Sequence, residues 1–235
     1  MENKQLVEKY IGAIESSVNL KGTTDAQIYL VNNQYIVKTH ISDGQATANW
    51  YQYNHAFAPQ LVYGSNELLI YTYEHQDGNL DRYHIIDIFA KYNPKHVSIC
   101  DEIYYSNLEQ DYKQACSEFN LIPIKNNRPT NELSFHLHGD MGFHNLIVTN
   151  VGIKLIDPQP HVGSKAADLL QFYVSDPRIM KLMTITEISK YFDQTSFNYY
   201  FPLILADRIV RSSYHHPQDL EFYKKTYNSY ISKIK

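Results

Sequence analysis

Apolar side chains recur on one helical face over residues 2–18, at Leu6, Val7, Tyr10, Ile11 and Ile14. This spacing of three to four residues predicts an amphipathic helix at the start of the chain. The pattern then changes to that of strands, over residues 27–31 and 34–39. Asn32-Asn33 separates the two runs, and Asn tolerates the positive φ angles of a tight turn, so we expect a β-hairpin here.

The next segments alternate between the two patterns. Residues 43–56 predict a helix, and residues 60–63 and 67–73 predict two further strands. A cluster of turn-forming residues follows at Gln76-Asp77-Gly78-Asn79. We place the boundary between two lobes there, with a first lobe over residues 1–75 and a second over residues 76–235.

The second lobe is predicted to be mainly helical. Helices are expected over residues 80–93, over about residues 101–119, and from residue 168 to the end of the chain. Between them the pattern predicts a strand over 133–138 and two short strands over 146–149 and 153–156, joined by a turn. Strands with one helix, followed mostly by helices, define an α+β protein with a strand-rich N-lobe.

Composition excludes several partners. The chain has 235 residues and a formal net charge of -4, with no basic stripe, so we expect no nucleic-acid partner. It contains no apolar run of the roughly 20 residues that cross a bilayer, so we expect no membrane association. Two cysteines in no metal-binding or disulfide pattern, with no secretory signal, favour a cytoplasmic protein. The oligomeric state is not encoded in any recognisable signal.

The densest set of polar residues lies at His138-Gly139-Asp140 and at Asn145, followed by Asp157. Asn145 precedes the first short strand of the predicted hairpin, and Asp157 follows the second. Because a hairpin brings its two ends together, Asn145 and Asp157 should lie close in space. Their amide and carboxylate oxygens are the hard ligands that Mg²⁺ takes alongside phosphate oxygens.

This pattern resembles the aminoglycoside phosphotransferase and choline kinase families, relatives of the protein kinases. Their catalytic loop reads His-Gly-Asp, four residues, then Asn, with a later Ile-Asp. The resemblance implies a two-lobed protein-kinase-like fold that transfers the γ-phosphoryl group of ATP or GTP to a small hydroxylated acceptor. It implies that Asp140 is the catalytic base, that Asn145 and Asp157 hold Mg²⁺, and that His138 supports the loop.

The N-lobe carries the same resemblance. The segment that begins at Gly22-Thr23 is similar to the loop that covers the nucleotide, and Lys38 is similar to the strand lysine that contacts the ATP phosphates. Ile147 and Ile156 would then line the adenine pocket. A lysine there offsets phosphate charge, which is most of what phosphoryl transfer requires of a protein.

Two features depart from the family pattern. Residues 43–56 contain no Glu to pair with Lys38, so that ion pair is replaced by a hydrogen bond or made from elsewhere. The chain is also short for the family, which implies a reduced acceptor site. The acceptor itself is not identified by the sequence.

Two other functions stay open. A kinase-like fold without its helix Glu could bind nucleotide yet transfer nothing, since a fold does not guarantee its chemistry. A zinc hydrolase could instead use His136, His138 and Asp140, because imidazoles and carboxylates suit Zn²⁺. The kinase interpretation also accounts for Lys38 and Asp157, which the zinc interpretation leaves without a role.

Overall fold

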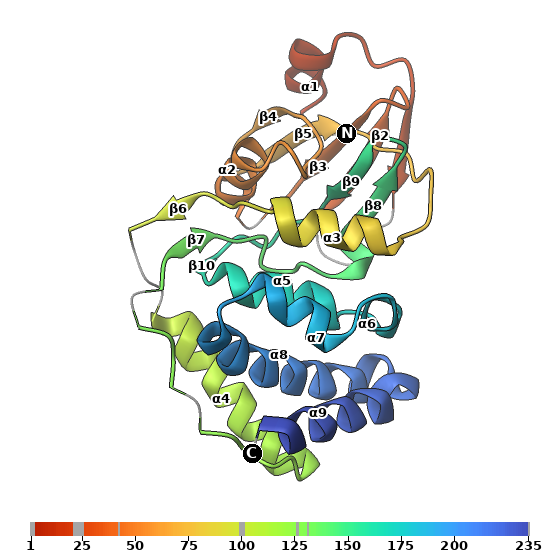
Figure 1. Ribbon diagram of the computed structural model, residues 1–235. Helices are drawn as coiled ribbons and strands as arrows, with labels where there is room; N and C mark the ends of the chain where they lie inside the picture. Colours follow the sequence, from red (N-terminus) through yellow and green to blue (C-terminus); the bar gives the residue numbers. More distant parts are fainter. Residues whose placement is uncertain are drawn as a thin grey trace. The chain divides into compact units, whose positions relative to one another are not determined.

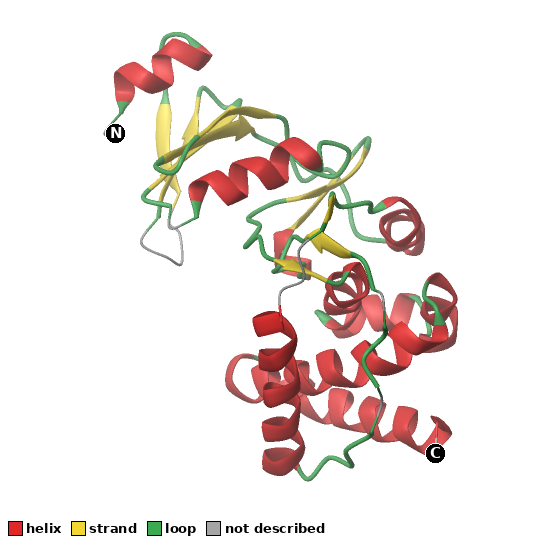
Figure 2. Cartoon of the chain, turned by 90° about the vertical axis from the view of Figure 1, so that its left-hand side faces the viewer, coloured by secondary structure: helices red, strands yellow, loops and turns green. Residues whose placement is uncertain are grey.

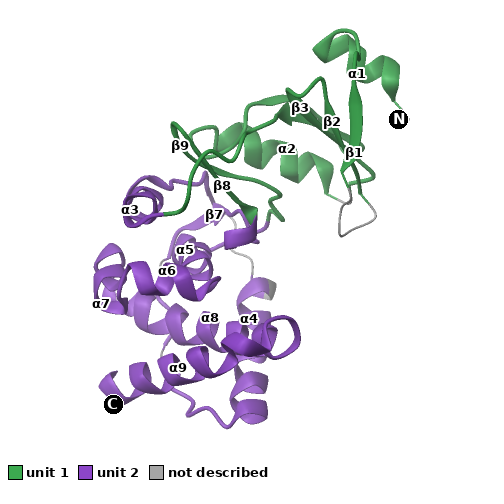
Figure 3. Ribbon diagram, turned by 90° about the vertical axis from the view of Figure 1, so that its right-hand side faces the viewer, with its two compact units in different colours: residues 1–80, 145–160 green, residues 81–144, 161–235 purple. Residues whose placement is uncertain are grey.

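The computed structural model describes residues 3–20, 26–41, 43–98, 102–125, 127–130 and 132–234. The chain divides into two compact units, coloured separately in Figure 3. Unit 1 comprises residues 1–80 and 145–160, and unit 2 comprises residues 81–144 and 161–235. The division into a nucleotide-binding lobe over residues 1–75 and a catalytic, acceptor-binding lobe over residues 76–235 stays a prediction.

Unit 1 is built on a five-stranded antiparallel sheet with the strand order β1-β2-β3-β5-β4 (Figure 1). Its strands are β1 (Ser17–Leu20), β2 (Gln27–Val31), β3 (Tyr35–Thr39), β4 (Leu61–Gly64) and β5 (Leu68–Thr72). The predicted hairpin is confirmed, since Val31 pairs with Tyr35 and both Asn32 and Asn33 adopt φ of 52°.

Helix α1 (Lys4–Ile11) packs on one face of this sheet. It contributes Val7 to a buried cluster whose other members come from the sheet: Val31, Val37, Leu68 and Ile70. The prediction of a helix through residue 18 is wrong at its end. Gly12 adopts φ of 78°, a left-handed conformation that suits glycine and ends the helix, and Ser17–Leu20 then pairs with β2.

Helix α2 (Gly44–Tyr53) contacts β4 and β5. A separate antiparallel hairpin of β8 (Leu146–Thr149) and β9 (Gly152–Leu155) completes unit 1. Backbone bonds attach it there: Leu155 N–H donates to Phe57 O at 2.6 Å, and Asp77 N–H donates to Val148 O at 2.9 Å. A segment distant in sequence therefore belongs to the N-terminal unit.

Unit 2 is mainly helical (Figure 2). Its helices are α3 (Arg82–Lys91), α4 (Glu102–Phe119), α5 (Lys165–Val174), α6 (Pro177–Leu182), α7 (Ile185–Ile188), α8 (Gln194–His215) and α9 (Leu220–Ile234). A small sheet has the order β10-β7-β6, with β6 (His96–Val97), β7 (Ser134–His136) and β10 (Val162–Gly163). The two-residue strands β6 and β10 were not predicted, because two residues carry no detectable period.

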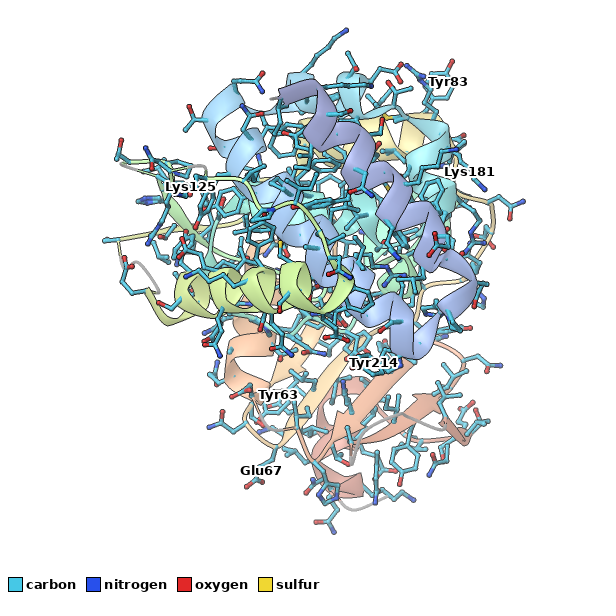
Figure 4. The ribbon with its side chains drawn as sticks, turned by 90° about the horizontal axis from the view of Figure 1, so that it is seen from below. Tyr63, Glu67, Tyr83, Lys125, Lys181 and Tyr214 are labelled. Atoms are coloured by element: carbon cyan, nitrogen blue, oxygen red, sulfur yellow. The ribbon has the colours of Figure 1, made fainter. Side chains whose placement is uncertain are left out.

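Helix α8 forms the centre of unit 2 and packs against α4, α5 and α9. Its first half is buried and apolar and includes Pro202. Large exposed side chains are scattered singly, such as Tyr83 and Tyr214 (Figure 4). Within the described ranges, no helix combines the length and the apolar character needed to span a bilayer.

Candidate active site

The lysine predicted to contact phosphates lies in the middle of the unit 1 sheet. Lys38 is on β3, where it pairs with Ile28 of β2 and with Leu69 of β5. Strands on both sides fix its backbone, and only 14% of its side chain is exposed. Its Nζ forms an ion pair with the carboxylate of Asp157. The structure therefore brings together two of the predicted site residues.

Asn145 and Asp157 flank the open end of the β8–β9 hairpin, as predicted. Leu146 pairs with Leu155, and Ile156 N–H donates to Asn145 O at 2.9 Å just beyond them. The side chain of Asn145 is buried, whereas that of Asp157 is 53% exposed. The two residues therefore sit at one end of the hairpin, and the Asp157 carboxylate is open to a ligand.

The backbone of Asp157 adopts φ of 54°, which is rare for a residue with a side chain. Its N–H donates to the Tyr51 hydroxyl at 3.2 Å. Tyr51 lies on α2, the helix on which the resemblance would place a glutamate. The missing ion pair is thus made from elsewhere, because Lys38 pairs with Asp157 and α2 contributes a tyrosine hydroxyl.

A cavity of about 1040 Å³ lies within unit 1, and both Lys38 and Asp157 line it. The other lining residues come from the positions just before α1 and β2, the end of β3, the start of α2, the β4–β5 turn and the segment after Asp157: Asn3, Ala26, Thr39, His40, Ile41, Asp43, Thr47, Asn66, Glu67, Pro158, Gln159 and Pro160. Most are polar, which suits a charged and hydrated ligand. The volume lies just above the usual range of about 300–1,000 Å³ for small-molecule sites.

Several nucleotide contacts stay predictions. Gly22 and Thr23 lie outside the described residues. Ile147 and Ile156 are half-buried on and beside the hairpin, and neither is among the residues that line the cavity. Their proposed contact with adenine therefore rests on the resemblance.

The donor set at the hairpin end fits Mg²⁺. Asp157 offers a carboxylate and Asn145 an amide oxygen, and hard oxygen donors of this kind bind Mg²⁺ together with phosphate oxygens and water. Over the part of the chain that the structure describes, no group of three or more His, Cys, Asp or Glu side chains is placed to hold a metal ion. A magnesium site here would thus need the phosphates to complete it.

The predicted catalytic base lies in unit 2, on the loop between β7 and β8. The Oδ2 of Asp140 lies 3.3 Å from the Nε2 of His144, and this hydrogen bond lowers the pKa of the Asp140 carboxyl. Gly142 leaves room for the imidazole, since a Cβ there would lie 2.6 Å from a ring carbon of His144. The geometry keeps Asp140 ionised, as a base must be. Neither His144 nor Gly142 carries a signal in the sequence that predicts this contact.

The buried carboxylate of Asp168 anchors the start of the same loop. Its Oδ2 accepts from His138 N–H at 2.9 Å and from the Tyr92 hydroxyl at 2.6 Å, and its Oδ1 accepts from Gly139 N–H at 3.1 Å. Asp168 comes from α5 and Tyr92 from the end of α3. Two helices therefore fix the backbone immediately before Asp140.

The same loop bears on the zinc interpretation. The Nδ1 of His138 accepts a hydrogen bond from Asp140 N–H at 3.4 Å, so this ring nitrogen is already used within the loop. His136 lies on β7 opposite Val162, and burial lowers its pKa. No observation favours a zinc centre over a loop that positions Asp140.

A strand-rich unit with a central lysine, followed by a helical unit with a braced aspartate loop, defines a protein-kinase-like fold. No protein-family profile matches this sequence, and no curated protein matches it. Solved structures do share its fold. A protein assigned as a fructosamine-3-kinase from Thermobifida fusca YX-ER1 has a TM-score of 0.59 at 13% identity, covering 96% of each chain.

Two aminoglycoside phosphotransferases show the same likeness. APH(2'')-IIa, in a ternary complex with streptomycin and ATP, has a TM-score of 0.57 at 13% identity over 88% of this chain and 86% of its own. ADP-bound APH(2'')-Ib has a TM-score of 0.55 at 15% identity over 94% and 96%. The fold predicted from the resemblance is confirmed, and at these identities the likeness concerns the fold alone.

Proposed function

We propose that this protein transfers the γ-phosphoryl group of ATP or GTP to a hydroxyl group of a small molecule. The observation that carries the proposal is the ion pair of Lys38 with Asp157 beside Asn145, on the wall of a polar cavity. A cation and a pair of hard oxygen donors are the groups that a magnesium–nucleotide complex requires.

Lys38 would contact the phosphates, and Asn145 and Asp157 would hold Mg²⁺, which would supply compensation for the phosphate charge. Exchange of the Lys38–Asp157 contact for contacts with phosphate and metal keeps both charges compensated. Gly22 and Thr23 are assigned to the nucleotide-covering loop.

Asp140 is proposed to accept the proton of the acceptor hydroxyl. The hydroxyl oxygen then bonds to the γ-phosphorus, the bond to the β–γ bridging oxygen breaks, and ADP or GDP leaves with that electron pair. The hydrogen bond from His144 keeps Asp140 ionised before transfer, and Asp168 holds the loop backbone.

The acceptor is proposed to be a hydroxylated small molecule of the sugar or amino-sugar type. This follows the names of the proteins that share the fold, which are aminoglycoside phosphotransferases and a protein assigned as a fructosamine-3-kinase. Ile147 and Ile156 are assigned to the adenine side of the nucleotide.

Nucleotide binding is tested by thermal unfolding with ATP or GTP, with and without Mg²⁺. A ligand at a hundredfold excess over its Kd stabilises the folded state by about 2.7 kcal/mol. We expect a clear upward shift that depends on Mg²⁺ and is reduced in Lys38→Met and in Asp157→Asn. If neither nucleotide moves the wild-type melting curve at saturating concentration, the proposal fails.

Transfer is tested by slow nucleotide hydrolysis, in which water replaces the acceptor, and then by a screen of sugars, amino sugars and amino alcohols. We expect Asp140→Asn to keep nucleotide affinity and to lower transfer by about 10²–10⁴, the usual contribution of a general base. Equal rates for wild type and Asp140→Asn in both assays would instead identify a nucleotide-binding protein without transferase activity.

A further inference from the structure

Tyr51 occupies an unusual position for a helix residue near a proposed metal ligand. It is 2% exposed, and its ring stacks on that of Tyr71, with centroids 4.9 Å apart and an interplanar angle of 19°. Its hydroxyl accepts the backbone N–H of Asp157 at 3.2 Å. Helix α2 contains no acidic residue, and the group that it presents to Asp157 is this neutral hydroxyl.

The backbone that Tyr51 contacts has an uncommon conformation. Asp157 has φ of 54°, which few non-glycine residues adopt, although Asp and Asn adopt it more readily than other types. Pro158 follows directly, and a proline favours extended backbone at the residue before it. Two contacts oppose these preferences: the Tyr51 hydroxyl on the backbone and Lys38 on the carboxylate.

The two contacts differ in whether a bound nucleotide would replace them. Lys38 is available to leave Asp157 when phosphates and metal arrive, because its side chain is long and lines the cavity. The Tyr51 ring is buried and stacked, so its hydroxyl stays in place. The backbone contact is therefore the one that persists in the nucleotide-bound protein.

We propose that Tyr51 is a positioning residue that holds Asp157 in the conformation needed to bind magnesium–nucleotide, in the place of the acidic residue expected on this helix. The inference rests on the proposed function for its consequence, but the contact itself is independent of any ligand. Tyr51 touches neither the nucleotide nor the reacting atoms, and acts through the backbone of Asp157.

The test compares Tyr51→Phe with the matched control Tyr63→Phe. Both remove one hydroxyl from unit 1 and keep the ring. Tyr63 packs against the buried cluster that contains Val7 of α1, and its ring stacks on that of Tyr10. It is labelled in Figure 4. The first measurement is amide hydrogen exchange of Asp157 by NMR on the full chain, without nucleotide or metal.

We expect the Asp157 amide to exchange about tenfold faster in Tyr51→Phe, a change of about 1.4 kcal/mol, and at the wild-type rate in Tyr63→Phe. The second measurement is Mg²⁺ titration of nucleotide binding. The Mg²⁺ midpoint should rise about tenfold in Tyr51→Phe, with metal-free nucleotide affinity unchanged.

Unchanged exchange at Asp157 in a folded Tyr51→Phe protein would overturn the inference, as would an equal Mg²⁺ shift in Tyr63→Phe. A uniform loss of affinity with and without metal would also count against it, since that is what a merely structural role produces. If wild type binds no nucleotide, the proposed function fails, while the exchange measurement still decides whether Tyr51 holds Asp157.

Discussion

Replacing Asp168 with Asn tests how the proposed catalytic loop is held. The carboxylate accepts three hydrogen bonds: from the Tyr92 hydroxyl and His138 N–H on one oxygen, and from Gly139 N–H on the other. Asn has nearly the same shape but only one acceptor oxygen, and its NH₂ group can only donate. Whichever way the amide turns, at least one backbone N–H of the loop faces another donor.

The expected loss of stability is that of the more favourable of the two amide orientations. If the amide oxygen of the substituted side chain faces His138 and Tyr92, two charge-assisted bonds become neutral, and each loses about 1 kcal/mol. Gly139 N–H is then left without an acceptor, at a cost of about 1–3 kcal/mol. Relief from burying a charge offsets part of this loss. We therefore expect a destabilisation of about 2–4 kcal/mol, or about 4–16 °C in Tm.

The assay is urea and thermal unfolding of Asp168→Asn beside Tyr92→Phe. Tyr92→Phe removes one donor and leaves both backbone bonds to the carboxylate, so it should cost only about 1 kcal/mol. Faster amide exchange at His138 and Gly139 should accompany the Asp168 change alone. A free energy of unfolding for Asp168→Asn within about 0.5 kcal/mol of wild type would refute the reasoning, since substitutions at ordinary surface positions change it by no more than that.

Two further predictions concern unit 2. Gly142→Ala should displace the His144 ring, because a Cβ at residue 142 would lie 2.6 Å from it. We therefore expect phosphoryl transfer to fall several-fold with little change in Tm. A large loss of Tm with normal transfer would contradict this prediction. Burial raises the pKa of Glu132 above 4.5, against the opposing hydrogen bonds from Ser164 and Tyr200, so the folded state binds this proton more tightly than the unfolded chain. Wild type should accordingly lose stability relative to Glu132→Gln as pH rises from about 4.5 through the raised pKa, and parallel urea midpoints across that window would show the idea to be wrong.

Much of the fold could be predicted because its signals are local. Asn32 and Asn33 adopt the positive φ angles that their side chains tolerate, and the strands on either side pair as expected. The hairpin after Asn145 follows from two short apolar runs and a glycine turn. The spacing of Asp140, Asn145 and Asp157 carried the resemblance, because a loop followed by a hairpin fixes positions within a short stretch of chain.

The contacts that complete the site could not be predicted, because they join residues far apart in sequence. Tyr51 and Asp157 are 106 positions apart, and no local pattern distinguishes Tyr51 from any buried aromatic residue of a helix. The absence of Glu from residues 43–56 signalled that something replaces it. Identifying the tyrosine required the register of α2 against the hairpin. The early end of α1 was visible in the sequence as Gly12. The prediction followed the helical spacing of the apolar residues instead, and so extended the helix too far.

The hairpin of β8 and β9 also bears on how this protein is made. Unit 1 takes residues 145–160 from the second half of the chain, so its N-terminal part is synthesised well before its last piece. At about 5–20 residues per second, residues 81–160 take several seconds to be synthesised. During that interval Phe57 O lacks its hairpin donor and Lys38 lacks Asp157. The nascent sheet is therefore exposed to chaperones and to neighbouring chains until translation has passed residue 160.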